Sequence, residues 1–261
     1  MSRIAAFVAA CALLAIPARA DEWEKRYNVS GAAEVRVAAA DGNVEVRTGN
    51  PGEVYARVTT QGFRIAEDEL RIVERQTGNR VEVELRLPKM TFWGVGNRSI
   101  RVEVAVPAGV RAEISTGDGN ITAREVSGNL RLSTGDGNID LMGISGPLSA
   151  NTGDGNIRVA GRFARLDLKT GDGNVQAEAT EGSRVAEPWT VRTGDGEVVL
   201  RLASKVAADF ELRTGDGGVT VDAAGVDDES RKENQRKGRL NGGGGLIRVT
   251  TGDGSIRLVQ R

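Results

Sequence analysis

The sequence predicts an all-β protein, a parallel β-solenoid or β-helix whose rungs contain about 18 residues and two short strands each. Three observations predict it. The tetrapeptide Thr-Gly-Asp-Gly occurs seven times, its first four copies are spaced by 18 residues, and apolar and polar residues alternate in the segments that precede the copies. Because self-similarity at a fixed period is typical of repeat proteins, we expect a stacked array.

Two strands per repeat follow from the finer pattern. Gly-Asn-apolar triplets recur about every nine residues, as at Gly119-Asn120-Ile121 and Gly128-Asn129-Leu130. In segments 130–134 and 166–170 Leu and Thr alternate with polar residues, so Leu and Thr should face inward. Since the repeat lacks the two-residue Asn-Gly spacing of a hairpin, we expect it to coil, with rungs about 4.8 Å apart.

The Thr-Gly-Asp-Gly motif is predicted to form a corner. Its glycines would allow positive φ, and its Asp would accept hydrogen bonds from turn amides. Stacking would align a structural turn column with a Thr column just inside it, the column being Asp118, Asp136, Asp154, Asp172, Asp195, Asp216 and Asp253. The residues after the motif should form a hydrogen-bonded ladder between rungs, namely Asn120, Asn138, Asn156 and Asn174.

The first twenty residues have the pattern of a secretory signal peptide. A basic start at residues 1–3 precedes an apolar run at 4–16, and Ala18-Arg19-Ala20 is a small-residue cleavage site. A lipoprotein cleavage box ending at Cys11 is the alternative, although the apolar run continues past it. We therefore expect an exported protein of the periplasm or cell surface, with cleavage before Asp21 and no transmembrane segment in the mature chain.

Composition excludes several function classes for the mature chain. Removal of residues 1–20 takes away two arginines and the single cysteine, leaving 33 basic residues against 36 acidic ones. That balance argues against a nucleic-acid partner. The chain has no histidine, so histidine-based catalysis and zinc ligation are excluded, as are thiol nucleophiles and disulfides. Gly-Asp-Gly-Asn also lacks the lysine of a phosphate-binding loop, and we expect no cofactor.

The remaining chain divides into two regions. Residues 21–110 should form an irregular N-terminal β region that begins with a lead-in at 21–31. Within it, residues 66–76 fit either a helix or a strand, with the strand favoured, and 88–97 should be a loop. Residues 111–261 should form the regular solenoid.

Residues 226–245 interrupt the regular solenoid. They contain the almost wholly polar stretch Asp227–Arg239 and the glycine run 242–245. A segment of this composition is not expected to bury a core, so it is predicted to be a mobile loop. The strands at 246–249 and 255–259 should then resume and end the stack.

Several motifs together resemble a known family. They are Gly-Asn-Val-Glu-Val-Arg at 42–47, Val-Ala-Val-Pro-Ala-Gly-Val at 104–110, the serial Thr-Gly-Asp-Gly-Asn-Ile, and the closing Gly-Gly-Gly-Leu-Ile-Arg-Val-Thr-Thr-Gly-Asp-Gly-Ser-Ile at 243–256. Over residues 28–259 the chain resembles the bacterial "putative adhesin" domain of unknown function. The resemblance implies a β-solenoid in the cell envelope and supplies no catalytic residues.

Two outward columns are the candidate surface features. Just before each motif stand Ser115, Ser133, Asn151, Lys169, Arg192, Arg213 and Thr250. Lys169, Arg192 and Arg213 are consecutive cations in this order and form our candidate contact stripe for an envelope polymer or protein, although a solvated face is the simpler interpretation. Two positions earlier the column is Glu113, Arg131, Ser149, Asp167, Thr190, Glu211 and Arg248, in which unlike charges can be neighbours.

The favoured function is that of a non-enzymatic, adhesin-like binding or scaffold protein. A calcium-stabilised β-roll-like protein that uses the Asp column is one alternative, although the β-roll repeat places its Asp differently and twice per turn. A polysaccharide-cleaving β-helix enzyme with Asp172 and Asp195 as paired carboxylates is the other. Repetition makes these corners nearly equivalent, so we assign no catalytic or metal-binding residue.

Overall fold

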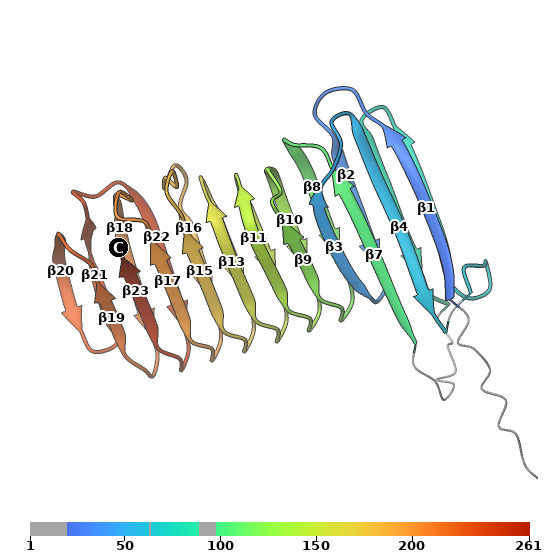
Figure 1. The fold of residues 1–261 in the computed structure, drawn as a ribbon. Coiled ribbons are helices and arrows are strands. Elements are labelled where there is room, and N and C mark those ends of the chain that lie inside the picture. Colours follow the sequence, from blue (N-terminus) through green and yellow to red (C-terminus); the bar gives the residue numbers. More distant parts are fainter. Residues whose placement is uncertain (1–19, 63, 89–97) are drawn as a thin grey trace, which may run out of the picture.

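The computed structural model describes residues 20–62, 64–88 and 98–261, and every regular element in these ranges is a β-strand. The predicted all-β solenoid is confirmed: two long sheets face each other, and the chain passes from one to the other at the corners (Figure 1). In the described ranges no helix is long and apolar enough to cross a membrane.

The first sheet has 11 strands. In spatial order they are β1 (Ala20–Asn28), β4 (Glu53–Gln61), β7 (Ser99–Val106), β3 (Asn43–Thr48), β9 (Ile121–Arg124), β11 (Ile139–Ser145), β13 (Ile157–Arg162), β15 (Val175–Ala179), β17 (Val198–Leu202), β23 (Ile256–Gln260) and β19 (Val219–Asp222).

The second sheet has 12 strands. Their spatial order is β20 (Val226–Lys232), β21 (Gln235–Leu240), β18 (Ala208–Thr214), β22 (Gly245–Thr251), β16 (Trp189–Arg192), β14 (Leu166–Lys169), β12 (Leu148–Asn151), β10 (Gly128–Ser133), β8 (Val110–Ser115), β2 (Glu34–Ala39), β6 (Arg80–Arg86) and β5 (Arg71–Thr77).

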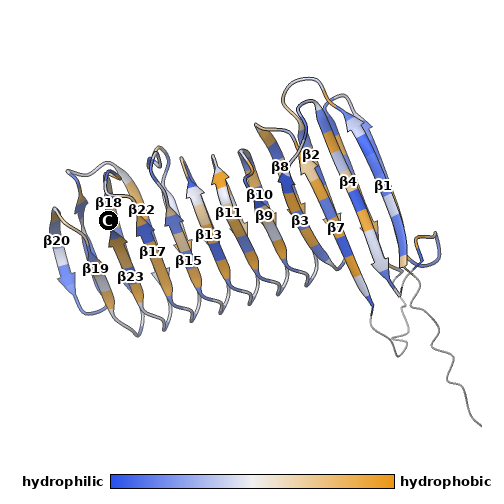
Figure 2. Cartoon of the chain, in the orientation of Figure 1, coloured by the Kyte–Doolittle hydropathy of each residue, from blue (hydrophilic) through white to orange (hydrophobic). Residues whose placement is uncertain are grey.

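The regular rungs stack in parallel register, so equivalent residues are neighbours. Leu130 pairs with Leu148, and Leu148 with Leu166, along the 12-stranded sheet. Inward residues of both sheets, such as Leu132 and Leu168, are fully buried between them, and the hydropathy of successive residues alternates along the strands (Figure 2). The core therefore lies in a thin layer between the sheets, and every second side chain is left on an outer face.

The two largest core side chains lie beside the longest regular corner. Trp189 in β16 and Phe163 after β13 pack edge to face with ring centroids 6.4 Å apart. The rung that contains Trp189 has 23 residues between motifs instead of 18. Its extra residues form the corner between β15 and β16 on the surface.

The last two strands do not end the stack, so that expectation is wrong. β22 lies between β16 and β18, and β23 lies between β17 and β19, with parallel pairing on both sides. The chain builds the rung of β18 and β19 first, leaves a gap, and fills the gap on its return. The C-terminal strands are thereby interior strands with both edges hydrogen-bonded.

The predicted loop at 226–245 is also wrong, because most of this segment forms the β20–β21 hairpin. β21 pairs antiparallel with both β18 and β20. Its inward positions are Arg236, Gly238 and Leu240, all buried. The guanidinium of Arg236 donates to both carboxylate oxygens of Asp228, at 2.8 and 2.6 Å. A long side chain can bury its stem when its head is paired, so a polar sequence still forms a cap.

Antiparallel strands also close the N-terminal end. The expected lead-in is strand β1, paired with β4, and the strand favoured at 66–76 is confirmed by β5. β1 and β5 meet where the Tyr27 hydroxyl donates to Glu74 at 2.5 Å and the Gln76 amide donates to the Asn28 carbonyl at 2.7 Å. The expected signal peptide, apart from Ala20, and most of the expected loop at 88–97 lie outside the described residues.

Candidate interaction surfaces

The corners are held by threonine. The Thr134 hydroxyl is buried and donates to the carbonyls of Gly117 and Gly119 in the preceding rung, at 2.9 and 2.8 Å. The same pair of contacts recurs at Thr152, Thr170, Thr193, Thr214 and Thr251. Threonine is therefore the inward member of the motif, as predicted, and it joins each corner to the next.

The glycines serve close approach and not positive φ, which corrects our prediction. Among the fourteen glycines of the seven motifs, only Gly217 has positive φ. A Cβ atom on Gly137 would lie 2.1 Å from the Gly119 carbonyl oxygen, and one on Gly155 would lie 2.0 Å from that of Gly137. Successive corners can stack at the rung spacing only because no side chain stands between them.

The structure places the seven aspartates along one edge, and all are exposed. Their spatial order is Asp118, Asp136, Asp154, Asp172, Asp195, Asp253 and Asp216, as the backbone bonds between successive motif glycines show. The predicted bonds to turn amides are not found at these seven. In the described chain such a bond exists only at the degenerate copy, where Gly42 N donates to Asp41 at 2.8 Å.

The Asp edge has no coordination cluster. Nowhere in the described ranges do three or more His, Cys, Asp or Glu side chains gather as metal ligands would. Asp172 and Asp195 are neighbours in the row and are exposed like the other five. Their surroundings do not distinguish them as an acid and a base.

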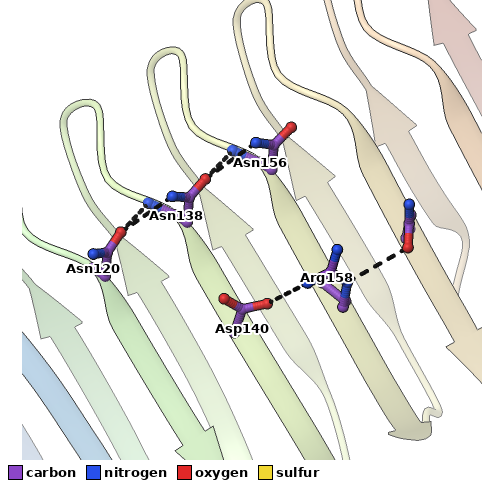
Figure 3. A network of polar contacts seen from close by, with 6 residues as sticks. Asn120, Asn138, Asp140, Asn156 and Arg158 are labelled. Atoms are coloured by element: carbon purple, nitrogen blue, oxygen red, sulfur yellow. Dashed lines mark hydrogen bonds and ion pairs between the residues drawn. The ribbon is translucent and has the colours of Figure 1, made fainter.

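The predicted asparagine ladder is confirmed (Figure 3). The backbone N–H of Asn138 donates to Oδ1 of Asn120 at 2.8 Å, and its Nδ2 donates to the same oxygen at 3.3 Å. Asn156 and Asn174 continue the ladder at 2.9 Å per backbone bond. Asn43 precedes it, and the backbone N–H of Glu197 ends it on Asn174.

One column on the outer face of the 12-stranded sheet alternates in charge from end to end. Glu211 shows the effect: it accepts from Lys237 and Arg248, and these bonds hold the pKa of its carboxyl below its usual range. Cross-strand neighbours of unlike charge fix register at little cost. In spatial order the column is Arg75, Glu82, Arg36, Glu113, Arg131, Ser149, Asp167, Thr190, Arg248, Glu211, Lys237 and Ser230.

The predicted contact stripe lies beside this column, and its order needs correction. Lys169 and Arg192 are direct cross-strand neighbours on β14 and β16. Arg213 is two strands further on, because Thr250 of the inserted β22 lies between it and Arg192. All three cations are exposed, and within the described residues none of them makes an ion pair. The stripe is thus a pair of adjacent cations and a third beyond a threonine.

A second polar surface on the 11-stranded sheet was not among the predicted sites. The Arg158 guanidinium reaches Asp140 at 3.3 Å and Gln176 at 3.5 Å, next to the asparagine ladder (Figure 3). The outward residues of the second strand in each repeat are the sequence signal that could have located it.

The comparisons follow from this geometry. The model of the Toastrack DUF4097 family matches residues 32–185 and 151–259, which together cover most of the chain. The chain belongs to the Toastrack family. The two matches overlap, as repeated rungs allow, and the Toastrack match covers both the irregular N-terminal strands and the regular array.

Solved structures share the Toastrack architecture at low identity. A "putative cell adhesion protein" from Clostridium sporogenes is 14% identical, with a TM-score of 0.47 over 93% of this chain and 100% of that one. A "putative adhesin" from Bacteroides fragilis is 13% identical, with a TM-score of 0.45 over 92% and 97%. A "Putative lipid binding protein" from Parabacteroides distasonis is 15% identical, with a TM-score of 0.40 over 92% and 97%. No curated protein matches the chain.

Proposed function

We propose that this Toastrack protein is an exported, non-enzymatic binding or scaffold protein of the cell envelope, and that its contact stripe binds an anionic polymer. One observation carries the proposal. Lys169 and Arg192 are adjacent like charges without a carboxylate partner among the described residues, on a face whose neighbouring column alternates in sign.

The energetics make this arrangement informative. Like charges directly opposite each other on neighbouring strands destabilise a sheet, whereas the alternating column stabilises it. Asp172 and Asp195 are close in sequence but lie beyond the corner, and neither forms an ion pair with the stripe. An external anion would relieve the repulsion between Lys169 and Arg192, which is the arrangement expected of a binding surface.

The solenoid suits an extended partner. Neighbouring rungs are about 4.8 Å apart, so a linear polymer can meet Lys169, Arg192 and Arg213 in succession through individually weak contacts. Thr250 between the last two would leave a gap of one strand in the row of charges.

The test uses two charge-matched double variants. Lys169→Glu/Arg192→Glu should reduce co-sedimentation with isolated cell envelopes by about tenfold or more, and raised salt should weaken wild-type association. Arg47→Glu/Arg124→Glu is the control, since these arginines are also exposed cross-strand neighbours without ion pairs in the described chain, but on the other sheet. Addition of Arg213→Glu to the first variant should remove residual binding.

Both double variants should keep the wild-type melting temperature, because all four side chains are exposed. Unchanged association of Lys169→Glu/Arg192→Glu would remove the stripe from the hypothesis. Turnover of an envelope glycan, lost in Asp172→Asn or Asp195→Asn, would contradict the non-enzymatic part of the proposal.

A further inference from the structure

Two hollows on the outer face of the 11-stranded sheet join into one trough. The first, of about 350 Å³, lies over β11, β13 and β15, and the second, of about 730 Å³, lies over β15, β17 and β23. They meet at β15, where Gln176 pairs with Val199 and Asn174 accepts from the Glu197 backbone at 2.8 Å. The trough crosses five adjacent strands, a length of about 19 Å at the rung spacing.

The first half of the trough presents planar hydrogen-bonding groups in rows. In the ladder Asn156 uses one amide proton on Asn138, at 3.2 Å, which leaves its second proton free for a ligand. The long contacts of Arg158 to Asp140 and Gln176 leave several of its five N–H donors directed to solvent (Figure 3). Donors and acceptors therefore alternate along the trough every few ångströms.

The second half has an apolar floor where a strand would ordinarily be polar. Val199 and Val259 occupy outward positions of β17 and β23, yet Val259 is only 8% exposed. Arg201 and Arg257 flank them and form no ion pair in the described chain. One wall is the longer corner after β15, which begins at Thr180.

The charges of the trough cancel, unlike those of the contact stripe. Its four acidic lining residues are matched by four arginines, the set being Asp140, Glu178, Glu181, Glu197, Arg158, Arg201, Arg257 and Arg261. A charged ligand would meet as much repulsion as attraction here. An uncharged ligand with many hydroxyl or amide groups would be able to use both kinds of partner.

We propose that this trough binds a linear, uncharged β-1,4-linked glycan. Such a chain is an extended ribbon, so it can follow the straight line of strands. Its hydroxyl or acetamido groups match the amide, carboxylate and guanidinium rows, and the apolar faces of its rings fit the Val199 and Val259 floor. This site is independent of the contact stripe, which lies on the opposite sheet.

The test is calorimetric titration of the full mature chain with cellohexaose and with the hexamer of N-acetylglucosamine. At least one should bind, and Arg158→Ala/Gln176→Ala should weaken that binding by about tenfold or more. Arg111→Ala/Asn129→Ala is the matched control, because it removes an exposed Arg and amide pair of neighbouring strands on the other sheet. It should bind as the wild type does.

A second variant tests the floor without removing a hydrogen bond. Val199→Lys should block the trough, and its fold is checked by its melting temperature. Binding should also persist in about 0.5 M salt and in Lys169→Glu/Arg192→Glu. Failure of both hexasaccharides to bind, or wild-type binding by both trough variants, would overturn the proposal. Loss of binding only in the stripe variant would assign the glycan to the stripe and also overturn it.

Discussion

At the scale of single residues, the repeat motif is a device for bringing backbones together. Threonine supplies a buried hydroxyl that bonds the preceding corner, and glycine supplies the absence of a side chain at the point of contact. Aspartate takes no part in these bonds at the seven full motifs and faces solvent. The motif is thus repeated for its first, second and fourth residues as far as the fold is concerned.

Substitution of one motif glycine tests this account. Gly155→Ala should destabilise the protein by about 2–4 kcal/mol, because its Cβ would lie 2.0 Å from the Gly137 carbonyl oxygen and the rungs would have to separate. Gly218→Ala is the control, since a Cβ there meets no atom within 4 Å. Urea unfolding of both variants measures the difference, and equal midpoints would show that close approach is not the reason for glycine.

At the scale of elements, the two ends of the stack are built differently from its middle. Parallel strands form the regular rungs, and antiparallel strands close both ends, β1 and β5 at one and β20 and β21 at the other. An open sheet edge invites pairing with another chain, and repeat proteins need end caps for that reason. β20, the outermost strand of its sheet, consists mainly of charged residues, which also protects the edge.

Closure of the N-terminal end should depend on acid pH. Burial acts to raise the pKa of Glu74, but its bonds to Lys25 and Tyr27 outweigh this effect, so the folded-state pKa lies below the unfolded value. The stabilisation is therefore fully present above about pH 4.3 and is lost as the pH falls through the lower folded value.

Urea unfolding of the wild type and Glu74→Gln between pH 7 and pH 3 measures this dependence. We expect the gap in unfolding free energy to narrow toward the acid end. A gap that stays constant would mean that the charge of Glu74 does not contribute to closing β1 onto β5.

Proteolysis should report the C-terminal cap. Trypsin should cleave the wild type first at the hairpin tip, after Arg231 or Lys232, which are exposed, and should spare the buried Arg236. Arg236→Gln removes the guanidinium that pairs with Asp228, costs about 1–3 kcal/mol locally, and should open the hairpin to cleavage at Lys237 and Arg239. Mass spectrometry of early fragments identifies the sites. Identical fragments from both proteins would argue against a capping role for Arg236.

At the scale of the whole molecule, the chain order and the spatial order of rungs differ at the C-terminus. The return of β22 and β23 into the stack makes the last residues of the sequence support strands on both of their sides. Stability in a solenoid comes largely from contacts between neighbouring rungs. The strands before the hairpin therefore depend on residues that follow it.

Truncation after Gly244 tests this dependence. Removal of β22 and β23 separates β18 and β19 from β16 and β17, so amides of residues 208–222 should lose most of their protection from hydrogen exchange. Amides of β10 to β13 should stay protected, which serves as the internal control. Retained protection of residues 208–222 would mean that β18 and β19 stack without the C-terminal rung.

The sequence alone determined the rung and its side-chain directions. Alternation at Leu130 and Leu132, the buried threonines, and the ladder of Asn120, Asn138, Asn156 and Asn174 all depend on period-two geometry and on the 18-residue spacing, which are local properties of the chain. The same spacing placed Lys169 beside Arg192.

Only the tertiary structure decided which rungs are neighbours. The rung that begins at Gly245 has the same alternation and motif as the others, so by its sequence it could stack on any free edge. Its position was decided by backbone pairing, because the hairpin occupies one edge of β18 and leaves the other for β22. That choice separated Arg213 from Arg192 by Thr250. The trough likewise needed the structure, because β23 brings Arg257 and Val259 beside Val199 and Arg201 only through a pairing of strands more than fifty residues apart in the chain.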